Sequence, residues 1–159
     1  MKTPIKLTIS TFKKRFRQDF IAAALFGSRA RKGEIFKSDW DLFLIIENIP
    51  KNPFDRQLLL REILPKDASK VSLLPKTKVE FESDFPPLYL DLAIDGTILH
   101  DTNNYLRSKL EEIKRILKKT GLKREKIRQG WIWKWERYPK GRWRIDWEGI
   151  YGLESGSKL

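Results

Sequence analysis

The chain has 159 residues, no cysteine and a net charge of +12 at neutral pH. This length suits one domain or one domain with an appendage, and the lack of cysteine excludes a disulfide framework and a thiolate metal site. The single histidine, His100, excludes a multi-histidine zinc site. No apolar run approaches the roughly 20 residues of a membrane span and the first ten residues lack a signal-peptide core, which predicts a cytoplasmic protein with no membrane partner.

The N-terminal segment is predicted to be an amphipathic helix capped by Ser10. Phe12, Phe16 and Phe20 recur every four positions and share one face, and the basic residues between them are expected to form a solvated face. Residues 21–26 follow without polar alternation. They are predicted to form a strand buried on both sides.

Two polar motifs adjoin the predicted strands. Gly27-Ser28 ends the first strand, where glycine lets backbone N–H groups approach a phosphate and the serine hydroxyl can donate to phosphate oxygen. Asp39 and Asp41 open a second predicted strand, 39–46, and acids one residue apart lie on the same side of a strand. Such a pair is costly unless a cation lies between its members, and oxygen ligands suit magnesium.

A short helix and a loop are expected between Ser28 and Ser38, with Arg29 and Arg31 near their start. Guanidinium groups match phosphate oxygens, so both arginines are candidate phosphate ligands. Phosphate and metal ligands are thus predicted to converge on one edge of one sheet.

The motif of Gly27-Ser28, ten residues and Asp39-x-Asp41 resembles the signature of the minimal nucleotidyltransferase (MNT) family within the polymerase-beta-like superfamily. The fragments LFGSRAR and SDWDLFLII carry the likeness, which covers roughly residues 20–100. The resemblance implies an α/β (α+β) fold with a small mixed sheet flanked by helices. It also implies transfer of a nucleoside monophosphate, expected to be AMP from ATP, to an acceptor hydroxyl.

The resemblance assigns roles to six residues of this sequence. Mg²⁺ or Mn²⁺ would be held by the catalytic acids Asp39 and Asp41. The nucleotide phosphates would be bound by Gly27, Ser28, Arg29 and Arg31. Small basic members of the family resemble antitoxins that adenylylate a HEPN partner protein, and the same is implied here.

The next segment is predicted to contain a helix over 54–64 and a strand over 71–74, closed by Pro75. Thr77 and Glu80 fit a capping box, which favours a short helix, although the apolar alternation there equally allows a strand.

Two foldings of residues 86–100 decide whether the site has a third acid, which three-acid members of the superfamily place beside the Asp-x-Asp strand. In one, 88–94 is a strand and Asp91 is that acid. In the other, Pro86-Pro87 begins a helix, and Gly96 is its left-handed end before a strand. We favour the helix, and the third-acid position then falls near Ser72, which carries no acid.

The longest predicted helix, 105–120, is capped within 101–104 and ended by Gly121. Its apolar stripe is expected to serve core or dimer packing. The stripe consists of Leu106, Leu110, Ile113 and Leu117.

Tryptophans alternate with other residues along 131–135 and again along 143–147. Pro139-Lys140-Gly141 has the chemistry of a hairpin loop, which would set Trp135 opposite Ile145 and Trp133 opposite Trp147. The same register would pair Glu136 with Arg144 and Lys134 with Asp146. The tryptophan row could stack bases, but burial against the domain or across a dimer is favoured.

The sequence therefore predicts a nucleotidyltransferase domain over 1–121, a Trp-rich basic β-hairpin extension over 122–152 and a disordered tail over 153–159. Residues 101–159 hold 16 Lys and Arg against 8 Asp and Glu, which suits an anionic partner such as RNA. A homodimer is also allowed. Two alternatives to an enzyme stay open, namely a non-catalytic module that binds nucleotide, RNA or protein, and a nucleotide-binding regulatory subunit.

Overall fold

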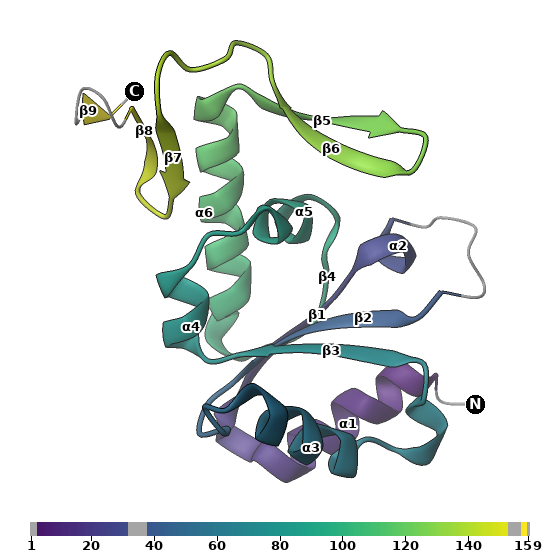
Figure 1. Cartoon of the computed structure of the whole chain (residues 1–159). Helices are drawn as coiled ribbons and strands as arrows, with labels where there is room; N and C mark the ends of the chain where they lie inside the picture. Colours follow the sequence, from purple (N-terminus) through teal and green to yellow (C-terminus); the bar gives the residue numbers. More distant parts are fainter. Residues whose placement is uncertain (1–2, 32–37, 153–156, 159) are drawn as a thin grey trace.

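A four-stranded mixed sheet lies at the centre of the computed structural model, which describes residues 3–31, 38–152 and 157–158 (Figure 1). The strand order is β3-β2-β1-β4. β2 runs antiparallel to β1 and parallel to β3, and β4 runs antiparallel to β1. The four strands are β1 (Phe20–Phe26), β2 (Trp40–Ile46), β3 (Val71–Lys76) and β4 (Thr97–Asp101).

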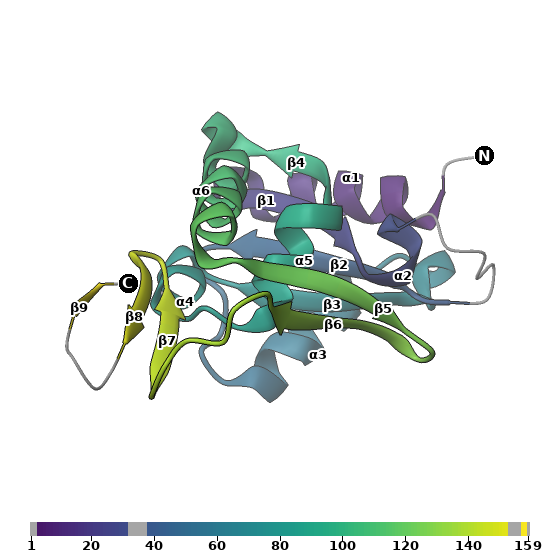
Figure 2. The ribbon, with the colours of Figure 1, turned by 90° about the horizontal axis from the view of Figure 1, so that it is seen from above.

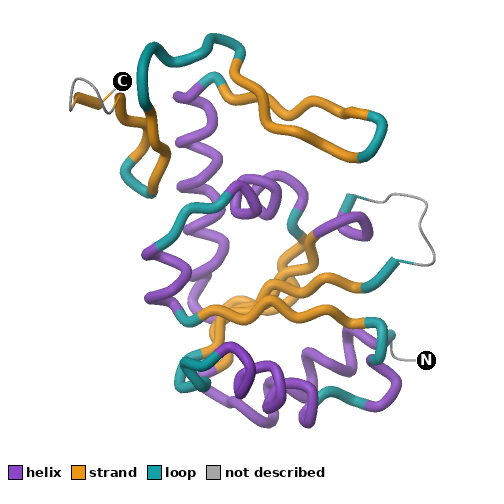
Figure 3. Tube along the Cα trace, in the orientation of Figure 1, coloured by secondary structure: helices purple, strands orange, loops and turns teal. Residues whose placement is uncertain are grey.

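Helices cover both faces of this sheet (Figure 3). One face packs against α1 (Pro4–Phe16) and α3 (Pro53–Ile63), and the other against α4 (Lys78–Ser83), α5 (Pro87–Asp95) and α6 (Tyr105–Thr120). The four-residue α2 (Gly27–Ala30) follows β1 directly. Short 3-10 helices occupy Arg17–Asp19, Lys66–Ala68 and Thr102–Asn104. The predicted α+β architecture is confirmed.

The strand β2 lies between two apolar layers. Leu42 and Leu44 belong to the cluster on the α1 side, while Phe43 and Ile45 belong to the cluster on the α6 side, and all four are fully buried. Burying each such side chain stabilises the fold by roughly 1.5–3 kcal/mol. The two layers therefore fix the position of β2, and with it the start of the strand, where the acids lie.

The N-terminal helix begins earlier than predicted. Thr3 is its cap, since its hydroxyl accepts from the backbone N–H of Lys6 at 3.4 Å, and Pro4 occupies the first helical position, where it needs no N–H donor. Ser10 lies inside α1, and Phe20 belongs to β1. The helix ends because Arg17 adopts a positive φ of 51°.

The middle of the chain largely follows the prediction. The capping box is confirmed, because Thr77 and Glu80 bond each other's backbone N–H. β3 extends through Pro75, which an edge strand tolerates. Residues 87–95 form a helix, but Gly96 has a φ of −59°, so the predicted left-handed end is wrong. There the backbone itself leaves no room for a side chain, because a Cβ on Gly96 would overlap the Leu92 carbonyl.

The helix α6 is confirmed, with its predicted apolar stripe buried and Gly121 left-handed at its end (φ 72°). Asp101 caps it, accepting from the backbone N–H groups of Leu106 and Arg107 at 2.9 Å each. No helix among the described residues is both long and apolar enough to cross a membrane.

The predicted pairing of the two tryptophan segments is wrong. β6 (Gly130–Trp135) pairs with β5 (Leu122–Ile127) through a two-residue turn, and β7 (Trp143–Asp146) pairs with β8 (Gly149–Gly152). The charged pairs change accordingly: Lys134 meets Glu125, Glu136 meets Lys123, and Arg144 meets Asp146. Alternation of residues along a strand defines the two faces of the strand but not its partner strand. Pairing with the nearer segment closes a shorter loop and therefore costs less conformational entropy.

The tail prediction, 153–159, falls largely outside the described residues. Ser157–Lys158 forms β9 beside β8. Figure 2 shows the β5–β6 hairpin extending from the end of α6 across α5 toward α2, with β7 and β8 on the other side of α6.

Candidate active site

Gly27 lies against the carboxylate of Asp41. The antiparallel register sets Phe26 opposite Asp41, so the first residue after β1 lies at the start of β2. Gly27 has a φ of +74°, and a Cβ there would overlap Asp41 Oδ2. Glycine is therefore required both for the left-handed backbone and for the close approach. The structure brings together the Gly-Ser motif and the second acid, as the sequence predicted.

Asp41 carries a raised pKa. Burial is the main cause, the neighbouring carboxylate of Asp39 adds to it, and the Arg31 guanidinium acts in the opposite direction. Asp39 itself is exposed at the mouth of the strand. Two like charges, one of them partly desolvated, make the start of β2 a place where a cation is favoured.

Ser28 and Arg29 hold the start of β2 against α2. The Ser28 hydroxyl donates to the Ser38 hydroxyl at 3.1 Å, and Arg29 Nε donates to the Ser38 carbonyl at 2.7 Å. The Arg29 guanidinium also lies 4.0 Å from the ring centroid of Trp40. Ser38 was not singled out in the sequence. Arg29, a predicted phosphate ligand, thus has contacts that position the acid-bearing strand.

Arg31 belongs to an ion-pair chain that leads away from the acids. Its Nη1 lies 3.6 Å from Asp95 Oδ2, and Asp95 also accepts from both terminal nitrogens of Arg124. Arg124 in turn lies 3.5 Å from Asp91. Sequence reasoning missed Asp95 and Arg124, because a helix end and a strand 29 residues apart give no local signal.

Asp91 is not a third acid of the site. It lies on α5, where its carboxylate accepts from the indole N–H of Trp133 at 3.1 Å. The residue that β3 sets opposite Asp41 is Ser72. His100 is structural, since its Nε2 lies 2.9 Å from the Phe20 carbonyl oxygen and its ring stacks on Phe20. Across the described ranges, no cluster of three His, Cys, Asp or Glu could hold a metal.

The residues present fit a divalent cation held by two carboxylates. Asp39 and Asp41 supply oxygen ligands, which magnesium and manganese prefer. Burial and the Asp39 carboxylate disfavour the ionised form of Asp41 and raise its pKa, and a neighbouring cation would stabilise that ionised form. The remaining ligands would have to come from elsewhere, and phosphate oxygens are of the right chemistry.

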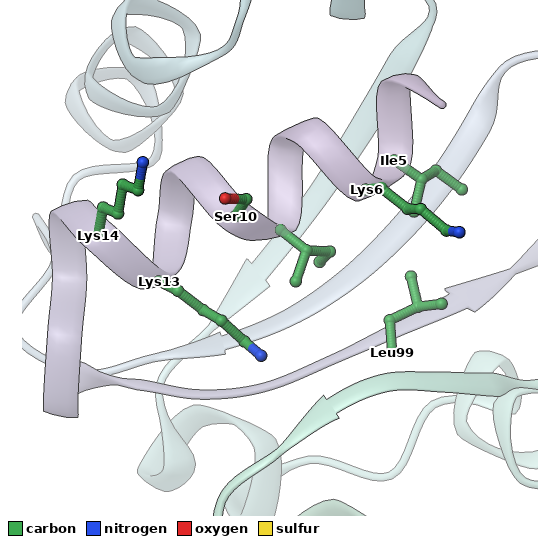
Figure 4. A pocket seen from close by; sticks show the side chains of 7 residues that line it. Ile5, Lys6, Ser10, Lys13, Lys14 and Leu99 are labelled. Carbon is green, nitrogen blue, oxygen red and sulfur yellow. The ribbon is translucent and has the colours of Figure 1, made fainter. Parts of the chain in front are cut away.

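A separate cavity of about 550 Å³ lies between α1 and β4 (Figure 4). None of the predicted site residues lines it. Its lining consists of Ile5, Lys6, Ile9, Ser10, Lys13, Lys14 and Leu99.

The chain is similar in sequence to one curated protein. It is 32% identical over 114 residues to the "Putative protein adenylyltransferase" of Methanocaldococcus jannaschii, and the match covers 67% of this chain and 76% of that protein. The chain belongs to the MNT family. This MNT chain is accordingly a nucleotidyltransferase.

Solved structures agree with this family in fold. The MNT chain superposes on a chain of a toxin–antitoxin crystallised with AMP-PNP with a TM-score of 0.53 and 15% identity, covering 74% of this chain and 89% of that one. A mutant of the toxin–antitoxin MntA-HpeT gives a TM-score of 0.52 at 14% identity, with the same coverage of 74% and 89%. No family model matches the chain.

Proposed function

We propose that this MNT chain transfers AMP from ATP to a hydroxyl group of a protein acceptor. The observation that carries the proposal is the contact between the Gly27 backbone and the Asp41 carboxylate, with Asp39 two residues before Asp41, just ahead of β2. A phosphate-binding turn and an acid pair are the two parts that nucleotidyl transfer requires. The name of the archaeal relative and the AMP-PNP of the structural neighbour support adenylyl transfer.

In the proposed reaction, Gly27 and Ser28 bind the terminal phosphates of ATP, while Asp39 and Asp41 hold Mg²⁺ or Mn²⁺. The bound metal supplies positive charge to the α-phosphate and to the departing pyrophosphate. The acceptor oxygen attacks the α-phosphorus, and the bond to the bridging oxygen of pyrophosphate breaks. With Ser72 in place of an acid opposite Asp41, the acceptor proton is released to water.

Arg29 and Arg31 act on this site in different ways. Arg29 fixes Ser38 and Trp40, so it aligns the acids rather than the phosphates. Arg31 lowers the pKa of Asp41 and, at 3.6 Å from Asp95, is held loosely enough to reach a phosphate.

The proposed acceptor is a HEPN-type partner protein, as the family resemblance implies. Two structural neighbours are toxin–antitoxin complexes, which supports an antitoxin role. We further propose that residues 1–121 form the catalytic unit, that 122–152 is an appendage and that the protein works in the cytoplasm. RNA binding and homodimer formation stay predictions at this point.

The test is incubation of the purified protein with α-labelled ATP, Mg²⁺ and extract of its own cells. We expect one labelled protein band with the wild type and none with the Asp39→Asn, Asp41→Asn double variant. Asp55→Asn, which removes an exposed acid on α3, is the matched control and should label as the wild type does. Equal labelling by all three proteins would refute the assignment.

The alternative is a non-catalytic nucleotide-binding module. The observation that favours it is Ser72, which leaves the acid pair without a third carboxylate. Calorimetry gives the same result for both, and the labelling experiment distinguishes them. A module would bind ATP with Mg²⁺ in the wild type, lose binding in the double variant and label nothing.

A further inference from the structure

A groove lies between the C-terminal half of α6 and the β5–β6 hairpin, and neither Asp39 nor Asp41 lines it. Figures 1 and 2 show the hairpin leaving the end of α6 and running alongside α5. The cavity measures about 650 Å³. Its lining contains five apolar residues, four cations, one acid and one glycine: Ile94, Leu117, Leu122, Trp131, Trp133, Lys114, Lys118, Lys123, Arg124, Glu136 and Gly121.

The tryptophans of β6 share one face of the hairpin with residues of β5. In the observed register Trp131 lies opposite Lys126 and Trp133 opposite Arg124, and directly opposed residues point to the same side. Trp133 is used by the fold, because its N–H donates to Asp91. Trp131 is 41% exposed, and the Arg124 guanidinium lies 4.6 Å from its ring centroid.

The tryptophans of the C-terminal segments therefore fall into two groups, those packed within the protein and the exposed Trp131. Trp135 packs edge-on against Trp143, with ring centroids 4.7 Å apart, and Trp147 donates its N–H to the Asp84 carbonyl at 2.9 Å. These rings stabilise the appendage. Trp131 presents an exposed aromatic surface at the distal end of the row, with a cation beside it.

The surroundings of the groove are strongly basic. Residues 114–135 contain nine Lys and Arg and a single acid, Glu125. Three of the lining cations already meet carboxylates: Lys114 pairs with Glu111, Lys123 with Glu136, and Arg124 with Asp95.

Two exposed lysines are not neutralised in this way, one on the groove wall and one opposite Trp131 in the hairpin. Within the described ranges, no carboxylate lies at ion-pair distance from Lys118, on the groove wall, or from Lys126, opposite Trp131. Positive charge thus remains available where the exposed ring lies.

We propose that this groove binds single-stranded nucleic acid, with one base stacked on Trp131 and the adjoining phosphates bound by Lys118 and Lys126. An aromatic platform accepts any unpaired base through its π-face, and nearby ammonium groups neutralise the backbone. A duplex keeps its bases stacked on each other and leaves the ring unused. An acidic peptide uses the lysines but not the ring.

The cavity between α1 and β4 provides a contrast within the same chain. Lys6, Lys13 and Lys14 surround it, and it is lined by aliphatic rather than aromatic side chains (Figure 4). Lys13 and Lys14 are exposed and, like Lys118 and Lys126, have no described ion-pair partner. Removing them changes the net charge equally without touching the proposed platform.

The experiment measures fluorescence anisotropy of a labelled RNA oligonucleotide of about 12 nucleotides, within the range of known single-strand sites, as NaCl is varied. The wild type should bind with quenching of tryptophan emission. Lys118→Gln with Lys126→Gln should reduce the slope of log affinity against log salt by about 1.4, the value for two phosphate contacts on a single strand. Lys13→Gln with Lys14→Gln should leave slope and quenching unchanged.

Two substitutions test the ring itself. Trp131→Ala should weaken binding at least about fivefold, and Trp131→Phe should retain most of the affinity because it keeps a stacking surface. The Asp39→Asn, Asp41→Asn variant should bind RNA as the wild type does, which separates this site from the proposed transfer reaction.

Several results would overturn the proposal. They are absence of saturable binding, equal losses in the two lysine pairs, wild-type affinity of Trp131→Ala, duplex RNA binding with the same affinity and quenching, or competition by polyglutamate as effective as that by unlabelled RNA.

Discussion

Asp41 and Glu80 are both carboxylates next to the central sheet, and their surroundings shift their pKa in opposite directions. Glu80 accepts from both terminal nitrogens of Arg56, at 2.9 and 2.8 Å, and from the backbone N–H of Thr77 at 2.9 Å. The Arg56 hydrogen bond is the main cause of its lowered pKa. Burial beside Asp39 raises the pKa of Asp41 instead.

The difference separates an acid that stabilises the fold from an acid that we propose holds a metal ion. Arg56 is only 7% exposed and also donates to the carbonyl groups of Pro50 and of Pro75 in β3. The Arg56–Glu80 pair therefore connects α3, β3 and α4. The Asp41 carboxylate accepts no hydrogen bond from the residues that the structure describes, although it is partly desolvated. Its charge is only partly offset, by the Arg31 guanidinium, which is a common condition of an acid in a binding site.

The largest expected effect comes from Gly27→Ala. The added methyl group would displace the Asp41 carboxylate and strain the left-handed backbone, and a displacement of about 1 Å commonly costs about 100-fold in rate. We expect AMP transfer to fall by about that factor in a radiolabel assay. The control is Gly121→Ala, at a similar φ of +72° but with open space around it, which should keep the activity.

Glu80→Gln should destabilise the protein by about 2–3 kcal/mol, because it leaves the Arg56 charge buried without its partner. Urea unfolding at neutral pH measures this, with the exposed Glu62→Gln as control. The pKa of Glu80 is lowered in the fold, so its contribution is present above its ordinary value of 4.5 and is lost as the pH falls through the folded value. The free energies of unfolding of the wild type and of Glu80→Gln should therefore converge in acid. A constant difference between them at every pH would contradict the assignment.

Tyr89→Phe tests a buried hydroxyl group that lacks a hydrogen-bond partner. Tyr89 is fully buried, and its hydroxyl has no hydrogen-bond partner among the described residues. Its removal should stabilise the protein by about 1 kcal/mol in urea unfolding. Tyr105→Phe is the matched control, since the Tyr105 hydroxyl donates to Glu82 at 2.7 Å, and it should lose a similar amount. A loss in both variants would show that Tyr89 has a partner.

The smallest effect is expected from Asp41→Asn, which should raise the melting temperature of the ligand-free protein by about 1–2 °C. Because the folded pKa of Asp41 is raised, the stability that its protonated form contributes is lost as pH rises through that value. The gain of the variant should be full at neutral pH and vanish below the ordinary value of 3.8. With saturating ATP and Mg²⁺ the order should reverse, since only the wild type gains stability from ligand binding.

The sequence was sufficient to predict the strands of the sheet and the proximity of Gly27 to Asp41, but not the strand order. Uninterrupted apolar runs mark strands buried on both sides, and two such strands joined by a short connection lie side by side. The prolines before 88–95 also identified a helix, which removed Asp91 from the site. These inferences needed only local composition and side-chain periodicity.

The parts that the sequence did not predict depend on contacts between distant segments. Arg29 was expected at a phosphate and instead clamps Ser38, and the link between Asp95 and Arg124 exists only once α5 and β5 are adjacent. The tryptophan pairing was wrong because LKREKI, with four charged residues in six, resembles a loop yet forms the partner strand β5. In the β5–β6 hairpin the cations lie among aromatic rings and carboxylates, and the composition of the segment does not predict these contacts.

The position of β2 between β1 and β3 has a consequence for synthesis of the protein. β1 and β2 are close in the chain, but the parallel partner β3 is reached only after α3, so the residue opposite Asp41 is made 31 positions later. Parallel pairing across such a connection forms late. On the ribosome, the nascent chain should therefore become able to retain nucleotide only after Lys76 has left the exit tunnel.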